Sequence, residues 1–363
     1  MKERVHFWDN YKGILIFLVV FGHFIYSYAG KLTGSFVESL YVFIYSFHMP
    51  AFIFCSGYFS KSENSRSKES LVKLLLYYFA FNALMGVFAY LYMGTKFKFL
   101  TPYYSYWYIL ALVMWRFVIK PLSRVKCLLP ISVAVALLIG YFSEFTNEFA
   151  VRRTIAFFPF FVAGYMMDRG KVDAFLTRRK TWQMAVSAVL VLMAAVAIFF
   201  VTKHYGITDA MTMMSPYTKK SNMLHRLLIM GIAVVAIVGM FLCVPNRHIP
   251  LLSKMGKNSL LVYLGHRFLT LVYYRDLFHY SDYNNMYLVY ALVATLITCM
   301  VLSSDILNRL TMDVFNIGTK AVCDPESQDG NYIITVIVVV FLIMLCVTGV
   351  PATTTLLEKV LGG

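Results

Sequence analysis

The feature that most constrains this chain is a series of long apolar segments that recurs along almost its whole length. Most hold about 17 to 25 residues with few charges, the length an α-helix needs to cross the hydrocarbon core of a bilayer. The segments lie near residues 13–30, 36–59, 71–94, 102–120, 127–143, 154–167, 182–202, 224–244, 258–275, 284–304 and 332–350.

Composition agrees with a membrane location. The chain is 60% hydrophobic and 14% charged, whereas soluble globular chains carry about 25% charged residues. A water-soluble core cannot absorb that much apolar surface. The sequence therefore predicts an all-α, polytopic membrane protein of about 10 or 11 transmembrane helices, in the plasma or inner membrane. The charges at Asp9 and Lys12 interrupt the first apolar run, so no cleaved signal peptide is expected.

The basic residues gather in alternate loops, which predicts the orientation. With a cytoplasmic N-terminus, cytoplasmic segments hold 21 of the 33 Lys and Arg residues, as the positive-inside rule requires. This placement explains the net charge of +15 without a nucleic-acid partner.

No linker or repeat divides the chain, so we expect a single membrane domain over residues 1–363, with a last helix near 332–350. The two longest loops are expected near 203–223 and 305–331, the second with a short interfacial helix around 306–315. The six cysteines are scattered singly, without the spacing of a metal or redox site. No metal site is predicted.

Three histidines, His23, His48 and His266, fall inside predicted spans. An ionisable residue there is costly and usually faces a cavity or a partner. Histidine also exchanges protons readily near neutral pH. For His266 the alternative is a packing role, with Arg267 beside it as a snorkelling anchor.

On the first helix, Lys12 and His23 are eleven residues apart, which places them within about 20° of one face and roughly 16 Å apart along the axis. Asp9 lies close to the same stripe. The predicted inward face runs through Ile16 and Val19 to His23. The alternative is that Lys12 and Asp9 simply pair at the interface and His23 bonds a neighbouring helix.

The second span contains His48 before Met49-Pro50, where the proline frees backbone carbonyls. Ser56-Gly57 follows, a small pair that permits close helix approach. A kinked packing helix with a satisfied histidine explains these residues equally well. Trp107 is predicted at the outer interface, where an aromatic-belt role competes with a binding role.

Five sequence segments occur in this order along the chain: RVHFWDNYKGILIFLVVFGH, FHMPAFIFCSGYFSK, WYILALVMWR, FFPFFVAGYMM and NSLLVYLGH. Together they resemble the acyltransferase-3 family of integral-membrane O-acyltransferases, in particular the branch similar to fucose 4-O-acetylases. The resemblance spans about residues 4–304.

The family's first-helix signature, a basic residue and then a histidine after ten others, matches Lys12 and His23. The resemblance implies that the histidine is the catalytic base, with Asp9 as the upstream acidic residue. The His-Met-Pro and Ser-Gly block matches His48 and Ser56, among others. Many members also carry two arginines three residues apart at the cytoplasmic start of the third helix. Here that region has Arg66, Lys68 and Lys73 but no such pair.

The resemblance further implies acetyl-coenzyme A as the acyl donor from the cytoplasm, and a hydroxyl of a cell-surface glycan or lipid-linked saccharide as the acceptor. No permanently bound cofactor is implied. The separation of roughly 16 Å approximates an extended pantetheine arm, which puts the phosphate end at Lys12 and the thioester at His23. Direct transfer and a covalent acetyl-histidine relay are both open. The candidate catalytic residues are His23, Asp9 and Lys12, and the candidate binding residues are Lys12, His48, Ser56, Lys73, Trp107 and His266.

The alternative from another class is a proton-coupled secondary transporter or flippase, in which the histidines form a proton relay. Such a protein usually shows repeated hydropathy between its halves, and this sequence shows none.

Overall fold

The computed structural model describes residues 6–29, 36–95, 101–143, 148–178, 180, 182–205, 213, 215–219, 221–277 and 286–324. In these ranges every regular element is helical and no strand is present. The predicted all-α, polytopic class is therefore confirmed. The elements are α1 (His6–Ala29), α2 (Phe36–Phe59), η1 (Asn64–Arg66), α3 (Lys68–Met93), α4 (Trp107–Leu122), α5 (Leu128–Leu138), η2 (Ile139–Tyr141), η3 (Glu148–Ala150), α6 (Val151–Met166), α7 (Arg169–Thr177), α8 (Trp182–Tyr205), α10 (Met223–Cys243), α11 (Pro250–Lys257), α12 (Ser259–Val272), η4 (Tyr273–Leu277), α13 (Tyr287–Leu302) and α14 (Asp305–Cys323).

Every apolar segment up to 284–304 coincides with a described helix, whereas 332–350 lies outside the described residues. Among the described helices, α2, α3, α8 and α10 are long and apolar enough to cross a membrane. The pair α13 and α14, bent by 54°, gives a fifth candidate if it forms one broken span. The total of 10 or 11 spans and the cytoplasmic N-terminus stay predictions.

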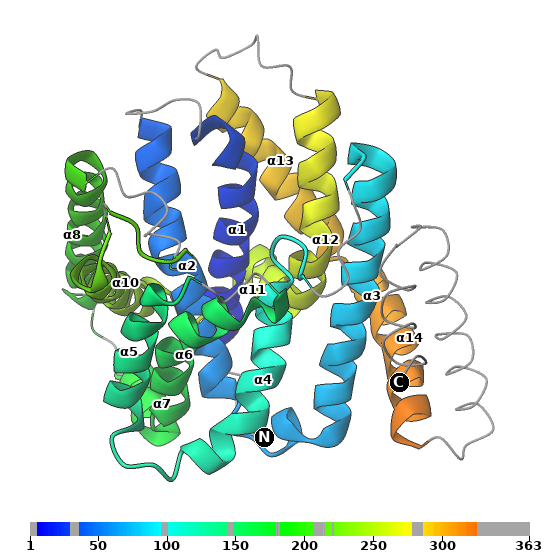
Figure 1. Cartoon of the computed structure of the whole chain (residues 1–363), viewed down its shortest axis with the longest axis horizontal. Helices are drawn as coiled ribbons and strands as arrows, with labels where there is room; N and C mark the ends of the chain where they lie inside the picture. The colour runs from blue at the N-terminus through cyan, green and yellow to red at the C-terminus, as the bar shows by residue number, and fades with distance from the viewer. Residues whose placement is uncertain are drawn as a thin grey trace, which may run out of the picture.

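Helices α1 and α2 lie side by side at the centre of the bundle (Figure 1). Helices α11, α12 and α13 pack against α1, and α6 packs against α2. Helices α8 and α10 pack together on one flank, while α3 and α14 form the other. The two central helices therefore pack against helices on both sides of the bundle.

The contact between α1 and α11 is a backbone contact. A Cβ atom on Gly256 would lie 1.7 Å from the carbonyl oxygen of Asp9, and one on Gly13 would lie 2.2 Å from that of Leu252. Buried Asn10 adds polar bonds to the same region, accepting from the Ser253 hydroxyl at 2.8 Å. Small residues at both sides of the contact allow this approach.

Helices α2 and α6 meet in the same way. A Cβ atom on Gly57 would lie 2.0 Å from the Phe161 oxygen, and one on Gly164 would lie 1.9 Å from the Phe54 oxygen. The close approach predicted from Ser56-Gly57 is thus present, and its partner is α6.

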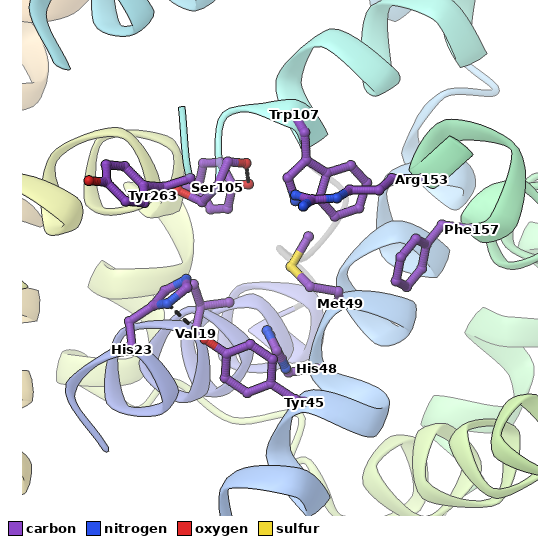
Figure 2. Close-up of a pocket in the computed structure, with 11 residues that line it drawn as sticks. Val19, His23, Tyr45, His48, Met49, Ser105, Trp107, Arg153, Phe157 and Tyr263 are labelled. Atoms are coloured by element: carbon purple, nitrogen blue, oxygen red, sulfur yellow. Dashed lines mark hydrogen bonds between the residues drawn. The ribbon is translucent and has the colours of Figure 1, made fainter. Parts of the chain in front are cut away.

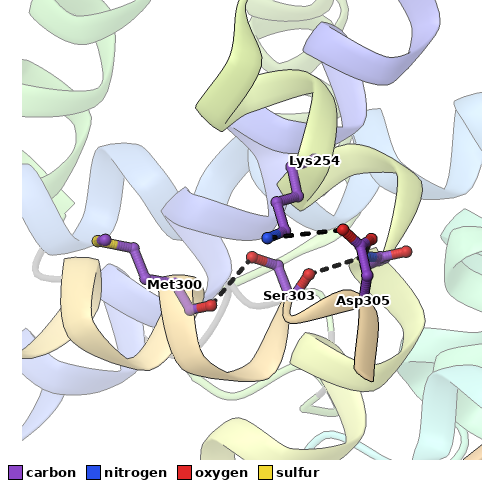
Figure 3. Close-up of polar contacts among 5 residues, drawn as sticks. Lys254, Met300, Ser303 and Asp305 are labelled. Carbon is purple, nitrogen blue, oxygen red and sulfur yellow. Dashed lines mark hydrogen bonds and ion pairs between the residues drawn. The ribbon is translucent and has the colours of Figure 1, made fainter. Parts of the chain in front are cut away.

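A polar junction joins α11 and α12 to the bend between α13 and α14 (Figure 3). The Asn258 amide donates to the Ser303 carbonyl at 2.7 Å and to an Asp305 carboxylate oxygen at 3.1 Å. Lys254 pairs with the same carboxylate at 3.7 Å. These contacts satisfy backbone groups exposed where α13 ends and α14 begins.

The segment predicted as a loop over 305–331 begins with α14, which extends well beyond the expected short helix at 306–315. It lies along α3, where Phe315 stacks on Tyr77 with 4.0 Å between ring centroids. The sequence reading also missed α7 and α11, because helices of nine and eight residues are too short to produce a clear apolar window.

We predict that Gly256→Ala lowers the free energy of unfolding by about 1 to 3 kcal/mol, because its Cβ would overlap backbone that has no rotamer to change. This net loss already allows for the roughly 1 kcal/mol by which alanine favours a helix over glycine. The measurement is the thermal midpoint of the detergent-solubilised protein. Gly231→Ala in α10, where nothing lies within 4 Å of the added atom, is the matched control and should not lower the midpoint. Equal midpoints for both variants would contradict the backbone contact.

Candidate active site

A pocket opens between α1, α2, α12 and the first turns of α4 and α6 (Figure 2). Its volume of about 70 Å³ leaves room for several water-sized groups. The lining residues are Val19, His23, Tyr45, His48, Met49, Tyr104, Ser105, Trp107, Arg153, Phe157 and Tyr263. Over the described ranges, no group of three or more His, Cys, Asp and Glu side chains is arranged to hold a metal ion.

His23 is held from a second helix. Its Nδ1 lies 2.8 Å from the hydroxyl of Tyr45 on α2, as the dashed line in Figure 2 shows. A hydroxyl both donates and accepts, so this contact is compatible with either protonation state of Nδ1. When Nδ1–H donates to Tyr45, Nε2 carries a lone pair and is able to accept a proton.

His266 lies directly against His23. The two rings stack with 5.1 Å between centroids and 25° between planes. The Nδ1 of His266 lies 2.7 Å from the Tyr263 carbonyl and 3.1 Å from that of Val262. Because a carbonyl only accepts, Nδ1 carries the proton. Its Nε2 is buried without a hydrogen-bond partner among the described residues.

His48 lines the pocket and is bonded within its own helix. Its Nδ1 donates to the Ile44 carbonyl at 2.6 Å. A neutral ring fixed in this way offers Nε2 as an acceptor only. In this tautomer neither His48 nor His266 can donate a hydrogen bond from Nε2 to an oxyanion, so both are better suited to accepting one from a substrate group.

The remaining predicted residues near the pocket are Trp107 and Arg267. Trp107 lines the pocket at the start of α4, is 4% exposed and packs on Phe157. Arg267 was considered as a snorkelling anchor, but it is 6% exposed and lies 4.3 Å from the centroid of the Tyr104 ring. The guanidinium is buried against an aromatic ring, which contradicts the alternative of a snorkelling anchor.

Lys12 lies at the other end of the predicted stripe. It pairs with Asp9 at 3.6 Å and lies 5.6 Å from the centroid of the Phe59 ring. The ion pair of the alternative interpretation is thus present. Between the two ends, Ile16 and Val19 are buried, and Val19 and His23 reach the pocket.

Further cations surround this Lys12 end, where α2 ends. Arg66 donates to the Ser60 carbonyl at 2.8 Å, and Arg116 donates to the Ser60 hydroxyl at 3.1 Å. Lys61 donates to the Met167 carbonyl. Burial, and then the nearby Arg169 charge, lower the pKa of the Lys61 ammonium from its ordinary value.

The other predicted binding residues have partners elsewhere. Ser56 donates to the Phe52 carbonyl at 2.9 Å and shares a hydrogen bond with the Tyr108 hydroxyl at 2.5 Å. Lys73 donates to the Asn316 amide oxygen of α14 at 2.6 Å. Neither residue lines the pocket.

Several pocket residues were not predicted from the sequence. Tyr45 stands three residues before His48, a spacing that places both on one helix face, and this signal was available. Arg153, next to the shortest apolar segment, was another available signal. Ser105 and Tyr263, joined by a hydrogen bond from the tyrosine hydroxyl to the Ser105 carbonyl, come together only through the tertiary fold.

A family model described as an acyltransferase domain matches residues 5–304. The chain belongs to the acyltransferase-3 family. It is therefore an O-acyltransferase and a multi-pass membrane protein. No curated protein and no solved structure matches it significantly.

We predict that Tyr45→Phe lowers kcat about two- to tenfold, because one hydrogen bond that orients His23 is worth about 0.5 to 1.5 kcal/mol. The KM values should change little, since the aromatic wall of the pocket is retained. Acyl transfer by the purified variant, measured over a range of pH, reports both quantities. Tyr41→Phe is the matched control, because it keeps the aromatic ring whose centroid lies 4.1 Å from that of Tyr45, and it should leave kcat close to wild type. An unchanged kcat and pH profile in Tyr45→Phe would contradict the positioning role.

Proposed function

We propose that this acyltransferase transfers an acetyl group from acetyl-coenzyme A to a hydroxyl of a cell-surface or exported glycan, or of its lipid-linked precursor, at the plasma membrane. One observation carries the proposal. A single helix, α1, presents a histidine to a pocket at one end of its inward stripe and a lysine within a basic region at the other. The histidine end suits the thioester of acetyl-coenzyme A, and the lysine end suits its phosphates.

The spacing along α1 supports the donor assignment. Eleven residues separate Lys12 from His23, a rise of roughly 16 Å that approximates an extended pantetheine arm. The cations around the Lys12 end, Arg66, Arg116 and Lys61, would attract the anionic nucleotide. Asp9 would hold Lys12 in place through their ion pair.

In the proposed reaction the acceptor hydroxyl oxygen attacks the thioester carbonyl carbon. Neutral His23 takes the hydroxyl proton at Nε2 while Tyr45 holds Nδ1. The carbon–sulfur bond then breaks, and the imidazolium returns the proton to the thiolate. The products are the O-acetylated saccharide and free coenzyme A.

The developing oxyanion needs a hydrogen-bond donor in the pocket wall. Ser105 lines the pocket, and its hydroxyl has no partner among the described residues. Stacking by His266 fixes the plane of the His23 ring, while His48 lines the pocket beside Tyr45.

We predict that His23→Ala lowers the turnover of acetyl-coenzyme A by about 10²- to 10⁴-fold, the contribution of a general base. Binding of a non-hydrolysable coenzyme A analogue should stay close to wild type, as should the protein level. His48→Ala is the matched comparison, because it removes the other histidine that lines the pocket, and it should cost less. A larger loss in His48→Ala than in His23→Ala would transfer the role of base to His48.

We predict that Lys12→Ala chiefly weakens donor binding, because a charge-assisted contact to phosphate is worth about 1.5 to 3 kcal/mol. The loss should shrink in high salt, which screens a partly exposed charge. Calorimetric titration with the same analogue at low and high salt measures it. Lys73→Ala is the comparison, because the Lys73 ammonium bonds Asn316, and this variant should bind the analogue more tightly than Lys12→Ala does. Unchanged affinity in Lys12→Ala would refute the channel geometry.

A further inference from the structure

The pocket contains a cation that the reaction above does not use. Arg153, in the first turn of α6, lines the pocket and lies 5.8 Å from the centroid of the Trp107 ring. Figure 2 shows its side chain beside Trp107 and above Phe157. No described residue forms an ion pair or hydrogen bond with it.

A second guanidinium lies against another part of the pocket wall. Arg267 lies behind the Tyr104 ring that forms part of the wall, and its buried Nε has no hydrogen-bond partner among the described residues. No carboxylate is among the residues that line the pocket. Arg153 is half-buried and Arg267 is buried, and stacking on aromatic rings compensates the lost hydration of a cation only in part. The described wall is therefore complementary to an anion.

Arg153 lies far from the donor's phosphates. Helix α6 ends beside Lys61, which bonds the Met167 carbonyl, and this is the Lys12 end of the bundle, since Lys12 covers Phe59. From Arg153 to Met166 the helix rises by about 20 Å. The anion opposite Arg153 must belong to the reacting part of a substrate.

We propose that the substrate carries a carboxylate or phosphate group, that Arg153 binds this group, and that it belongs to the acceptor saccharide. A planar guanidinium binds either group through two parallel hydrogen bonds. Held at Arg153, an acidic sugar would present a neighbouring hydroxyl to His23 across the same pocket. The inference rests on the proposed function, because it names the acceptor class for that reaction.

The test measures acetyl transfer by the purified protein to methyl glucoside, methyl glucuronide and glucose 1-phosphate. The wild type should show a lower KM for the two anionic acceptors. Arg153→Gln should raise that KM about ten- to a hundredfold, the loss of a charge-assisted contact, and should change the KM for methyl glucoside far less. Arg153→Lys should recover part of the loss, because it keeps the charge without the planar fork. Arg124→Gln, at an exposed position, is the matched control.

Two outcomes would overturn the assignment of Arg153 to the acceptor. A fall in kcat for methyl glucoside in Arg153→Gln would make the guanidinium an oxyanion donor. With methyl glucoside as the acceptor, the ratio of succinyl-coenzyme A turnover to acetyl-coenzyme A turnover can be compared between the wild type and Arg153→Gln. A different ratio in the variant would place the anion on the acyl group.

Two further measurements separate this inference from the proposed function. If the wild type transfers acetyl groups to all three acceptors with equal KM, the inference is refuted and the proposed function stays intact. If the wild type neither hydrolyses nor transfers acetyl-coenzyme A, the proposed function fails. Calorimetric titration with methyl glucuronide then decides the anion site alone, because the wild type should bind it and Arg153→Gln should not. Equal affinities would overturn the site.

Discussion

The backbone contact between α1 and α11 determines where the polar groups of this bundle point. Gly13 and Gly256 let the two backbones meet with no room for a Cβ atom, so α1 cannot turn about its axis without a collision. Asn10 fixes the same rotation through bonds to the Pro245 and Arg247 carbonyls at 2.9 and 2.7 Å. Because side chains follow at 100° per residue, this single contact sets the direction of the whole inward stripe, from the lysine to the histidine.

The contact between α2 and α6 gives the opposite wall the same rigidity. Helix α2 carries Tyr45 and His48, and α6 carries Arg153, so the glycines that join these helices also set the spacing of the polar groups across the pocket. A site assembled on helices that meet backbone to backbone keeps its geometry better than one on loops. The pocket can therefore be small and still hold polar groups apart at defined positions.

The sequence predicted what depends on local pattern and missed what depends on tertiary approach. The span 36–59 coincides with α2, because uninterrupted apolar length is a local property. His23, His48 and His266 were found because each is costly in an apolar segment, and the structure brings them to one pocket or against its wall. For Arg267 the sequence offers only the alternative of a snorkelling anchor, since no local pattern reveals the Tyr104 ring against which it packs. The roles assigned to these residues stay predictions.

The three histidines differ in the partner of their Nδ1 atom, which lies in the same helix for two of them and in a neighbouring helix for the third. His48 and His266 bond carbonyls three or four residues earlier in the same helix. Their tautomers are fixed by local structure, whatever the neighbouring helices do. His23 instead takes its partner, Tyr45, from α2. Its ring orientation consequently depends on the relative placement of α1 and α2. These helices meet closely one residue before His23, where a Cβ atom on Gly22 would lie 3.0 Å from the Tyr45 ring, so the packing of α1 on α2 controls the group proposed to move the proton.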